Sequence, residues 1–161
     1  MRFTIGQQLE MLLTSINLSE NRQVISNALH SYFQISHIEN VSIDGLHNVT
    51  YLDKLLDNKA AIQTGDLQIS GETDRVYIDT DHDIHLLDPG FNRKITVSKQ
   101  QALSTVLWNP WKEKSHSMSD MPDNGWSSML CIESANVADN TVAIDPGQKQ
   151  QLATTISVDH L

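Results

Sequence analysis

Apolar residues recur along this chain in short runs that alternate with polar residues, and long stretches with helical periodicity are almost absent. Such alternation is typical of β-strands that bury one face. The predicted strands are Arg2–Ile5, Gln8–Leu18, Val24–Ile35, Val41–Ile43, Gly65–Ile69, Arg75–Thr80, Ile84–Leu87, Arg93–Ser98, Ser104–Trp108, Ser128–Glu133, Thr141–Ile144 and Gln151–Val158.

Turn-forming pairs separate these runs. They supply a positive or pre-set φ at low cost, and they are Asp44-Gly45, Ser70-Gly71, Pro89-Gly90, Asn124-Gly125 and Pro146-Gly147. A short helical turn is expected only at Tyr51–Asp57, where three leucines share a side. Because short strands with tight connections favour antiparallel pairing, we predict an all-β fold, an antiparallel β-sandwich.

The segment Gln8–Leu18 has apolar side chains on both faces of the predicted strand. A strand of this kind is expected to be covered on both sides. A chain of 161 residues could lack one of these two covers.

Composition narrows the classes of partner. The chain has 161 residues, which fits one domain, and a formal net charge of −9 with only 11 scattered Lys and Arg, so we expect no nucleic-acid partner. The single cysteine, Cys131, indicates a reducing compartment. The first residues lack a secretory leader and no apolar run is long enough for a membrane span, so we expect a soluble, cytoplasmic protein without a membrane partner.

Two apolar segments each contain one ionisable side chain. His30 lies within Ala28–Phe33, and Glu133 lies within Met129–Val137. A carboxylate among apolar neighbours is costly unless it has a partner or a role, and a histidine titrates near physiological pH. If the fold brings the two together, they form an acid–base pair. The alternatives are that His30 is a hydrogen-bonded core residue and that Glu133 is a charge on an edge strand.

Three further features carry possible chemistry. Trp108-Asn109-Pro110-Trp111 makes an aromatic loop that could stack against a sugar or could simply close the end of a sandwich. The segment Asp81–His85 resembles a metal cluster, but it lacks a third ligand at a suitable spacing, so we interpret it as a polar turn and expect no metal. Cys131 has no local base and is interpreted as a packed residue.

Taken together, six markers resemble the glucose-6-phosphate 1-epimerases, the D-hexose-6-phosphate mutarotases of the aldose 1-epimerase-like superfamily. Their order and spacing make the resemblance specific. The markers are Ala28–Phe33, Gly45-Leu46 followed by Tyr51-Leu52-Asp53, Thr73–Tyr77, Trp108–Trp111, Cys131–Val137 and Pro146-Gly147.

The resemblance implies a fold and a mechanism. It implies a galactose mutarotase-like β-supersandwich that binds the sugar on an open concave face, without metal or cofactor. The implied substrate is a hexose 6-phosphate, glucose 6-phosphate first, whose α and β anomers are interconverted by ring opening. By resemblance Glu133 is the general base, His30 the general acid, and Asp74 binds sugar hydroxyls. Without the resemblance, Asp74 would be interpreted as a surface ion pair with Arg75.

The resemblance also implies that residues 1–161 form one domain that is the C-terminal portion of a longer enzyme. The N-terminal half of such enzymes carries arginines that bind the substrate phosphate and a further active-site histidine. We therefore expect negligible mutarotase activity from the isolated chain. Two alternatives stay open: a non-catalytic carbohydrate-binding protein, and a gene remnant with exposed apolar faces that self-associates.

Overall fold

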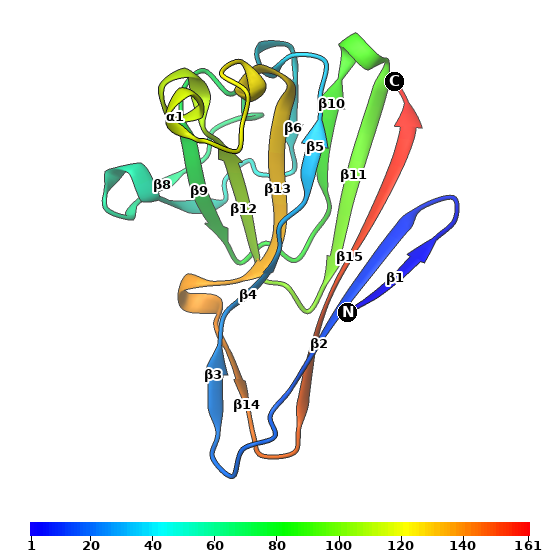
Figure 1. Cartoon of the computed structure of the whole chain (residues 1–161), viewed down its shortest axis with the longest axis vertical. Coiled ribbons are helices and arrows are strands. Elements are labelled where there is room, and N and C mark those ends of the chain that lie inside the picture. Colours follow the sequence, from blue (N-terminus) through cyan, green and yellow to red (C-terminus); the bar gives the residue numbers. More distant parts are fainter.

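The computed structural model of residues 1–161 contains two large antiparallel sheets and one small one (Figure 1). Across the six-stranded first sheet the order is β1 (Arg2–Ile5), β2 (Leu9–Ile16), β15 (Lys149–His160), β11 (Arg93–Gln100), β10 (Ile84–Asp88) and β6 (Ser42–Asp44). Across the second sheet the order is β4 (Asn27–Leu29), β13 (Met129–Asn136), β12 (Ser104–Asn109), β9 (Thr73–Ile78), β7 (Thr50–Asp53) and β8 (Lys59–Ile62), and β5 (Tyr32–Gln34) also pairs with β13. In the small sheet β3 (Gln23–Ile25) pairs with β14 (Val142–Ile144). The prediction of an all-β antiparallel sandwich is confirmed.

Helical structure is confined to short segments. The α-helix α1 spans Trp111–Ser117. The 3₁₀ turns are η1 (Ile38–Asn40), η2 (Lys54–Leu56), η3 (Pro89–Phe91), η4 (Gly125–Ser128) and η5 (Ala138–Asn140). None of the helices has the length and hydrophobicity that a membrane-spanning helix needs.

The two large sheets pack face to face through a cluster of 16 buried apolar or aromatic residues. Ile84 and Ile95 from the first sheet meet Leu107, Leu130 and Ile132 from the second in this cluster. Fully burying one such side chain contributes about 1.5–3 kcal/mol. Side chains alternate along a strand. The residues next to Leu107 in β12, and those next to Leu130 and Ile132 in β13, therefore point to the opposite, outer face of the second sheet.

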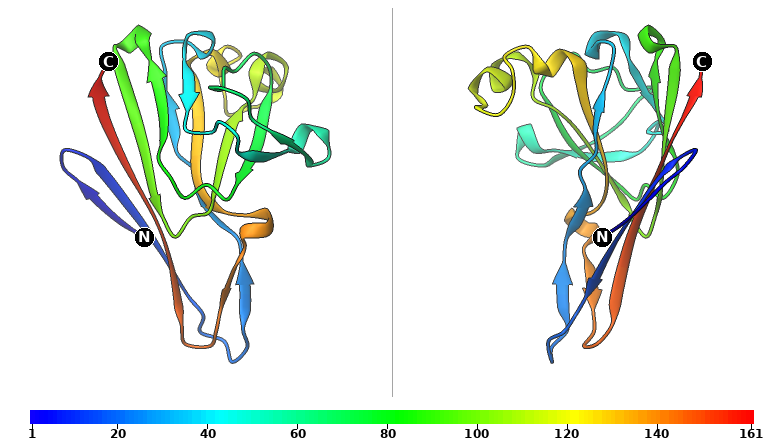
Figure 2. Two further views of the ribbon diagram at one scale, coloured as in Figure 1. Left: turned by 180° about the vertical axis from the view of Figure 1, so that it is seen from behind. Right: turned by 45° about the vertical axis from the view of Figure 1, so that its right-hand side comes forward.

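The N-terminal strands extend beyond the second sheet, as the views in Figure 2 show for the β1–β2 hairpin. Met11 and Leu13 of β2 pack beside a small buried cluster that contains Leu29. Ile16, on the other face of β2, is 57% exposed, and Leu18 is 90% exposed. The expectation that one cover of this strand could be absent agrees with this exposure.

Three predicted elements differ from the structure in more than their bounds. The run Val24–Ile35 forms β3, β4 and β5 instead of one strand, because its parts pair with β14 and β13 and the ladder is interrupted at His30 and Ser31. The run Gly65–Ile69 makes a single bridge, from Leu67 to Ile43; its apolar spacing reflects burial of Leu67 and Ile69.

The third difference concerns Tyr51–Asp57. Residues 50–53 belong to strand β7, and only η2 is helical. The Asp53 carboxylate accepts a hydrogen bond from the Leu55 N–H at 3.0 Å, which starts the turn. The prediction also missed β8, whose residues are all exposed and lack an alternating pattern, and α1, which follows Pro110.

Candidate active site

Strand register gathers the candidate residues on the outer face of the second sheet. Val76 of β9 lies opposite both Leu52 of β7 and Val106 of β12, and Val106 lies opposite Glu133 of β13. The register of β13 is the same on β4 and on β5, and continuing it across the interruption places His30 opposite Glu133. One row of side chains therefore crosses the sheet at right angles to its strands. The row ends with the Glu133 carboxylate and the His30 imidazole.

A second row lies two residues along the strands, on the same face. Trp108 of β12 lies opposite Asp74 of β9 on one side and Cys131 of β13 on the other. Cys131 in turn lies opposite Tyr32 of β5. Extending the β7–β9 register by one residue places Lys54 opposite Asp74. The two rows make a compact site from five segments that are far apart in the sequence.

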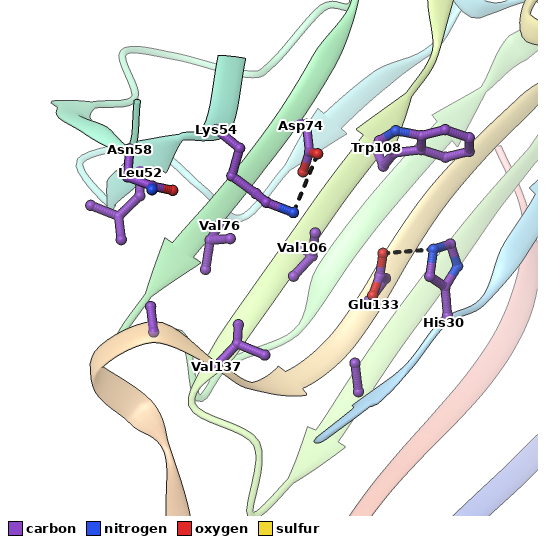
Figure 3. Close-up of a pocket in the computed structure, with 12 residues that line it drawn as sticks. His30, Leu52, Lys54, Asn58, Asp74, Val76, Val106, Trp108, Glu133 and Val137 are labelled. Atoms are coloured by element: carbon purple, nitrogen blue, oxygen red, sulfur yellow. Dashed lines mark ion pairs between the residues drawn. The ribbon is translucent and has the colours of Figure 1, made fainter. Parts of the chain in front are cut away.

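His30 and Glu133 are in direct contact. The His30 Nε2 and Glu133 Oε1 atoms are 3.1 Å apart, and Figure 3 shows both side chains at the same side of the cleft. The Glu133 side chain is only 8% exposed, whereas that of His30 is 44% exposed. Glu133 lies on a strand flanked by β12 and by β4 and β5, so the alternative that it is an edge-strand charge is wrong.

Burial favours the neutral form of both groups. Burial, and secondly the Asp74 carboxylate, raise the pKa of Glu133 to about 7, and the Lys54 ammonium opposes this rise. Burial lowers the pKa of His30 from its usual 6.5, although its backbone hydrogen bond and the Asp74 charge oppose the change. Near neutral pH the Glu133 carboxyl can therefore both accept and release a proton, as a general base must do over a catalytic cycle.

Aromatic rings position the imidazole. Tyr32 stacks on His30 with a centroid separation of 4.7 Å and an interplanar angle of 21°. Trp108 meets His30 edge to face at 6.2 Å. Two rings against the imidazole restrict its rotation. Trp111, by contrast, packs against Trp126 at 4.6 Å and against the core. The predicted aromatic loop thus divides: Trp108 lines the cleft, and Trp111 closes one part of the sandwich.

Asp74 lies across the cleft floor from the pair. Its Oδ2 atom is 3.3 Å from Lys54 Nζ, and the pair is drawn in Figure 3. Arg75, its neighbour in sequence, instead pairs with Asp53, at 3.6 Å. The ion pair between Asp74 and Arg75 considered from the sequence does not form, because adjacent residues of a strand point to opposite faces.

The cleft has a volume of about 650 Å³, within the range of small-molecule sites. Its floor is apolar and includes Val76, Val106, Leu52 and Val137, which pack in one cluster. Polar groups stand around this floor: His30, Lys54, Asn58, Asp74 and Glu133. An apolar floor with a polar rim suits a pyranose ring.

The other residues considered from the sequence lie elsewhere or are inert. Cys131 is completely buried, and this burial, with the nearby Glu133 charge, raises the pKa of its thiol, so it is a packed residue. His82 Nε2 lies 2.5 Å from the Gly45 carbonyl oxygen and His85 Nδ1 lies 3.1 Å from Thr96 Oγ1. No group of three His, Cys, Asp or Glu side chains in the structure is arranged to hold a metal ion.

Sequence reasoning missed Lys54 and Tyr32 as members of the site. The signal for Lys54 was its position directly after the Tyr51-Leu52-Asp53 marker, and that for Tyr32 was its two-residue spacing from His30. Neither signal is sufficient alone, because strand register decides which residues of separate strands become neighbours.

Fold and site together define a sheet-face cleft with a carboxylate–imidazole pair. The family model described as aldose 1-epimerase matches residues 1–157, and the chain belongs to this family. It is 35% identical over 157 residues to a protein of Escherichia coli (strain K12) named "Putative glucose-6-phosphate 1-epimerase", a match that covers 97% of this chain and 51% of that protein. A protein of the same name from Salmonella typhimurium is 34% identical over 158 residues, covering 98% of this chain and 52% of that protein.

Solved structures agree with this membership. The structure of a "putative mutarotase" from Salmonella typhimurium superposes with a TM-score of 0.88 at 32% identity, covering 99% of this chain and 52% of that one. A galactose mutarotase-like protein from Clostridium acetobutylicum, at 14% identity and a TM-score of 0.68, shows the same fold. The chain spans about half the length of the relatives it matches.

Proposed function

We propose that this cleft interconverts the α and β anomers of a hexose 6-phosphate, with glucose 6-phosphate as the first substrate to test. The observation that carries the proposal is the contact of 3.1 Å between His30 and Glu133 above an apolar floor. Family membership and the names of the relatives support the choice of reaction and substrate.

In the proposed reaction Glu133 removes the proton from the anomeric hydroxyl while His30 gives a proton to the ring oxygen. The bond between the anomeric carbon and the ring oxygen breaks, and an open aldehyde with a free hydroxyl results. Rotation about the adjacent carbon–carbon bond presents the other face of the aldehyde. In ring closure Glu133 gives its proton to the carbonyl oxygen while the attacking hydroxyl returns its proton to His30, so that both groups regain their starting states.

The geometry suits this exchange because the two oxygens that lose and gain protons are bonded to the same carbon. An acid and a base in contact with each other can both reach them. Each well-placed group typically accelerates a reaction by about 10²–10⁴-fold. We assign to Asp74 the binding of sugar hydroxyls, since its carboxylate faces the same cleft and is held by Lys54.

The test measures anomer exchange of glucose 6-phosphate by NMR in two proteins. The first is the chain itself, for which we expect exchange close to the uncatalysed rate. The second is a chimera in which this chain replaces the matching region of the Salmonella relative, for which we expect rapid exchange. In the chimera, Glu133→Gln and His30→Ala should each lower the catalysed rate by about 10²–10⁴-fold. A chimera that folds and binds the sugar but never accelerates exchange would contradict the proposal and favour a carbohydrate-binding protein.

A further inference from the structure

The cleft combines two carboxylates with a single ammonium group. Lys54 is the only Lys or Arg among the residues that line it, and its side chain reaches across the floor toward Asp74 in Figure 3. Two carboxylates that face one cleft repel each other and favour protonation of the more buried one. The positive charge of a cation paired with Asp74 opposes this repulsion.

The backbone fixes Lys54 in this position. Lys54 begins the turn η2, and the Asp53 carboxylate caps that turn through the Leu55 N–H at 3.0 Å. The β7–β9 register then sets Lys54 beside Asp74, with a distance of 3.3 Å between Nζ and Oδ2. The Asp74 side chain is 16% exposed and the Lys54 side chain is 50% exposed, so the carboxylate is more shielded from water than the ammonium.

Arg75 is not available to replace Lys54. Its guanidinium lies 4.5 Å from the centroid of the Tyr51 ring, and its Nε atom is 3.6 Å from the Asp53 carboxylate. Two ion pairs therefore connect β9 with β7 and η2. Asp74 pairs with Lys54 on the outer face of the sheet, and the next residue, Arg75, pairs with Asp53 on the opposite face.

We propose that Lys54 is a positioning residue of the cleft, which holds the Asp74 carboxylate against the sheet and offsets the negative charge of Asp74 at Glu133. This inference rests on the roles proposed above for Asp74 and Glu133. It assigns to Lys54 no contact with the reacting atoms.

Glu133 is surrounded by a small set of ionisable groups, so the effect of Lys54 can be isolated. They come from β5, β9, β13, η2 and the link between β4 and β5, and they are Tyr32, Asp74, Cys131, Lys54 and His30. The pKa values of the buried Cys131 and of the exposed Tyr32 are both raised, so both groups stay neutral while Glu133 titrates.

The experiment follows the Glu133 carboxyl carbon by ¹³C NMR as a function of pH in the free chain. Lys54→Met should raise the titration midpoint of Glu133 by roughly half a pH unit, because the opposing positive charge is lost. Lys54→Arg should restore the wild-type midpoint. Lys59→Met is the matched control, since Lys59 is exposed on β8 and does not line the cleft, and it should leave the midpoint unchanged.

Asp74→Asn completes the test, because it should lower the midpoint of Glu133 and reduce the additional effect of Lys54→Met. The proposal is overturned if Lys54→Met leaves Glu133 at its wild-type midpoint, or if Lys59→Met shifts it equally. Lys54→Gln provides a second neutral variant should the methionine variant fold poorly. The measurement needs no sugar and no turnover, so a failed anomer-exchange assay and a failed titration are separate results.

Discussion

The sandwich and the N-terminal arm, defined as residues 1–25, have similar strand-forming sequences but different burial. The sandwich core contains 16 buried residues in one cluster. In the arm only Asn17 is buried, and Phe3 and Ile5 of β1 are 58% and 84% exposed. Alternating apolar residues therefore suffice to form strands, whereas burial depends on whether a second sheet lies opposite.

The candidate site depends on the better-packed region. Glu133 projects from the outer face of β13, whose inner face carries Leu130 and Ile132, both 0% exposed. A strand fixed on its inner face by the core can hold a costly carboxylate on its outer face. Nothing comparable supports the arm, and none of its residues lines the cleft.

The largest expected effect is on stability. Leu107→Ala in the sandwich core should lower the free energy of unfolding by about 2–5 kcal/mol, because it removes a fully buried side chain and leaves a cavity. Leu18→Ala in the arm should change it by less than about 0.5 kcal/mol, because Leu18 is 90% exposed. Urea unfolding of both variants measures the difference. Equal losses would show that the arm is packed in solution against something that the structure does not show.

A second effect, smaller over any one pH unit, comes from a buried charged residue of the sandwich, a kind of residue that the arm lacks. Lys99 of β11 is 9% exposed, and its Nζ donates to Thr80 Oγ1 at 2.6 Å, to the Ser104 carbonyl at 3.3 Å and to Thr105 Oγ1. Burial lowers its pKa from 10.5 to about 7, and the Asp81 charge opposes the shift only partly. At pH values between about 7 and 10.5, Lys99 is therefore protonated in the unfolded chain and neutral in the folded chain.

The free energy of unfolding should therefore gain, from this group, up to about 1.4 kcal/mol per pH unit as the pH rises from about 7 toward 10.5. Lys99→Met should remove this gain. Lys149→Met, at an exposed position that pairs with the arm strand β2, is the control and should leave the pH dependence unchanged. Identical pH profiles for the wild type and Lys99→Met would show that Lys99 is hydrated in solution.

Most of the strand positions could be predicted from the sequence, because the apolar spacing that marks a strand also drives its burial. Arg2–Ile5 agrees to the residue with β1, and Gln8–Leu18 contains β2. Lys99 also left a signal, since it continues the core-facing series Ile95, Val97 at a spacing of two. Its burial escaped notice because a lysine in that position is normally solvated.

The site could be predicted only in part. His30, Glu133 and Asp74 could be named from the family resemblance, and their side chains do meet in one cleft. The partner of Asp74 could not be found, because Arg75 is nearer in sequence whereas Lys54 is nearer in space. Which residues of distant strands lie opposite each other is set by register, and no single segment of sequence encodes it.

The most direct test of the acid–base pair is a pH titration of Glu133 and His30 in the free chain by NMR, repeated in His30→Ala. We expect a Glu133 midpoint near 7, a His30 midpoint below 6.5, and a Glu133 curve that also responds to the His30 step and loses that response in His30→Ala. A Glu133 midpoint near the ordinary 4.5, unchanged by His30→Ala, would contradict the account, because the carboxylate would then be solvated and apart from the imidazole.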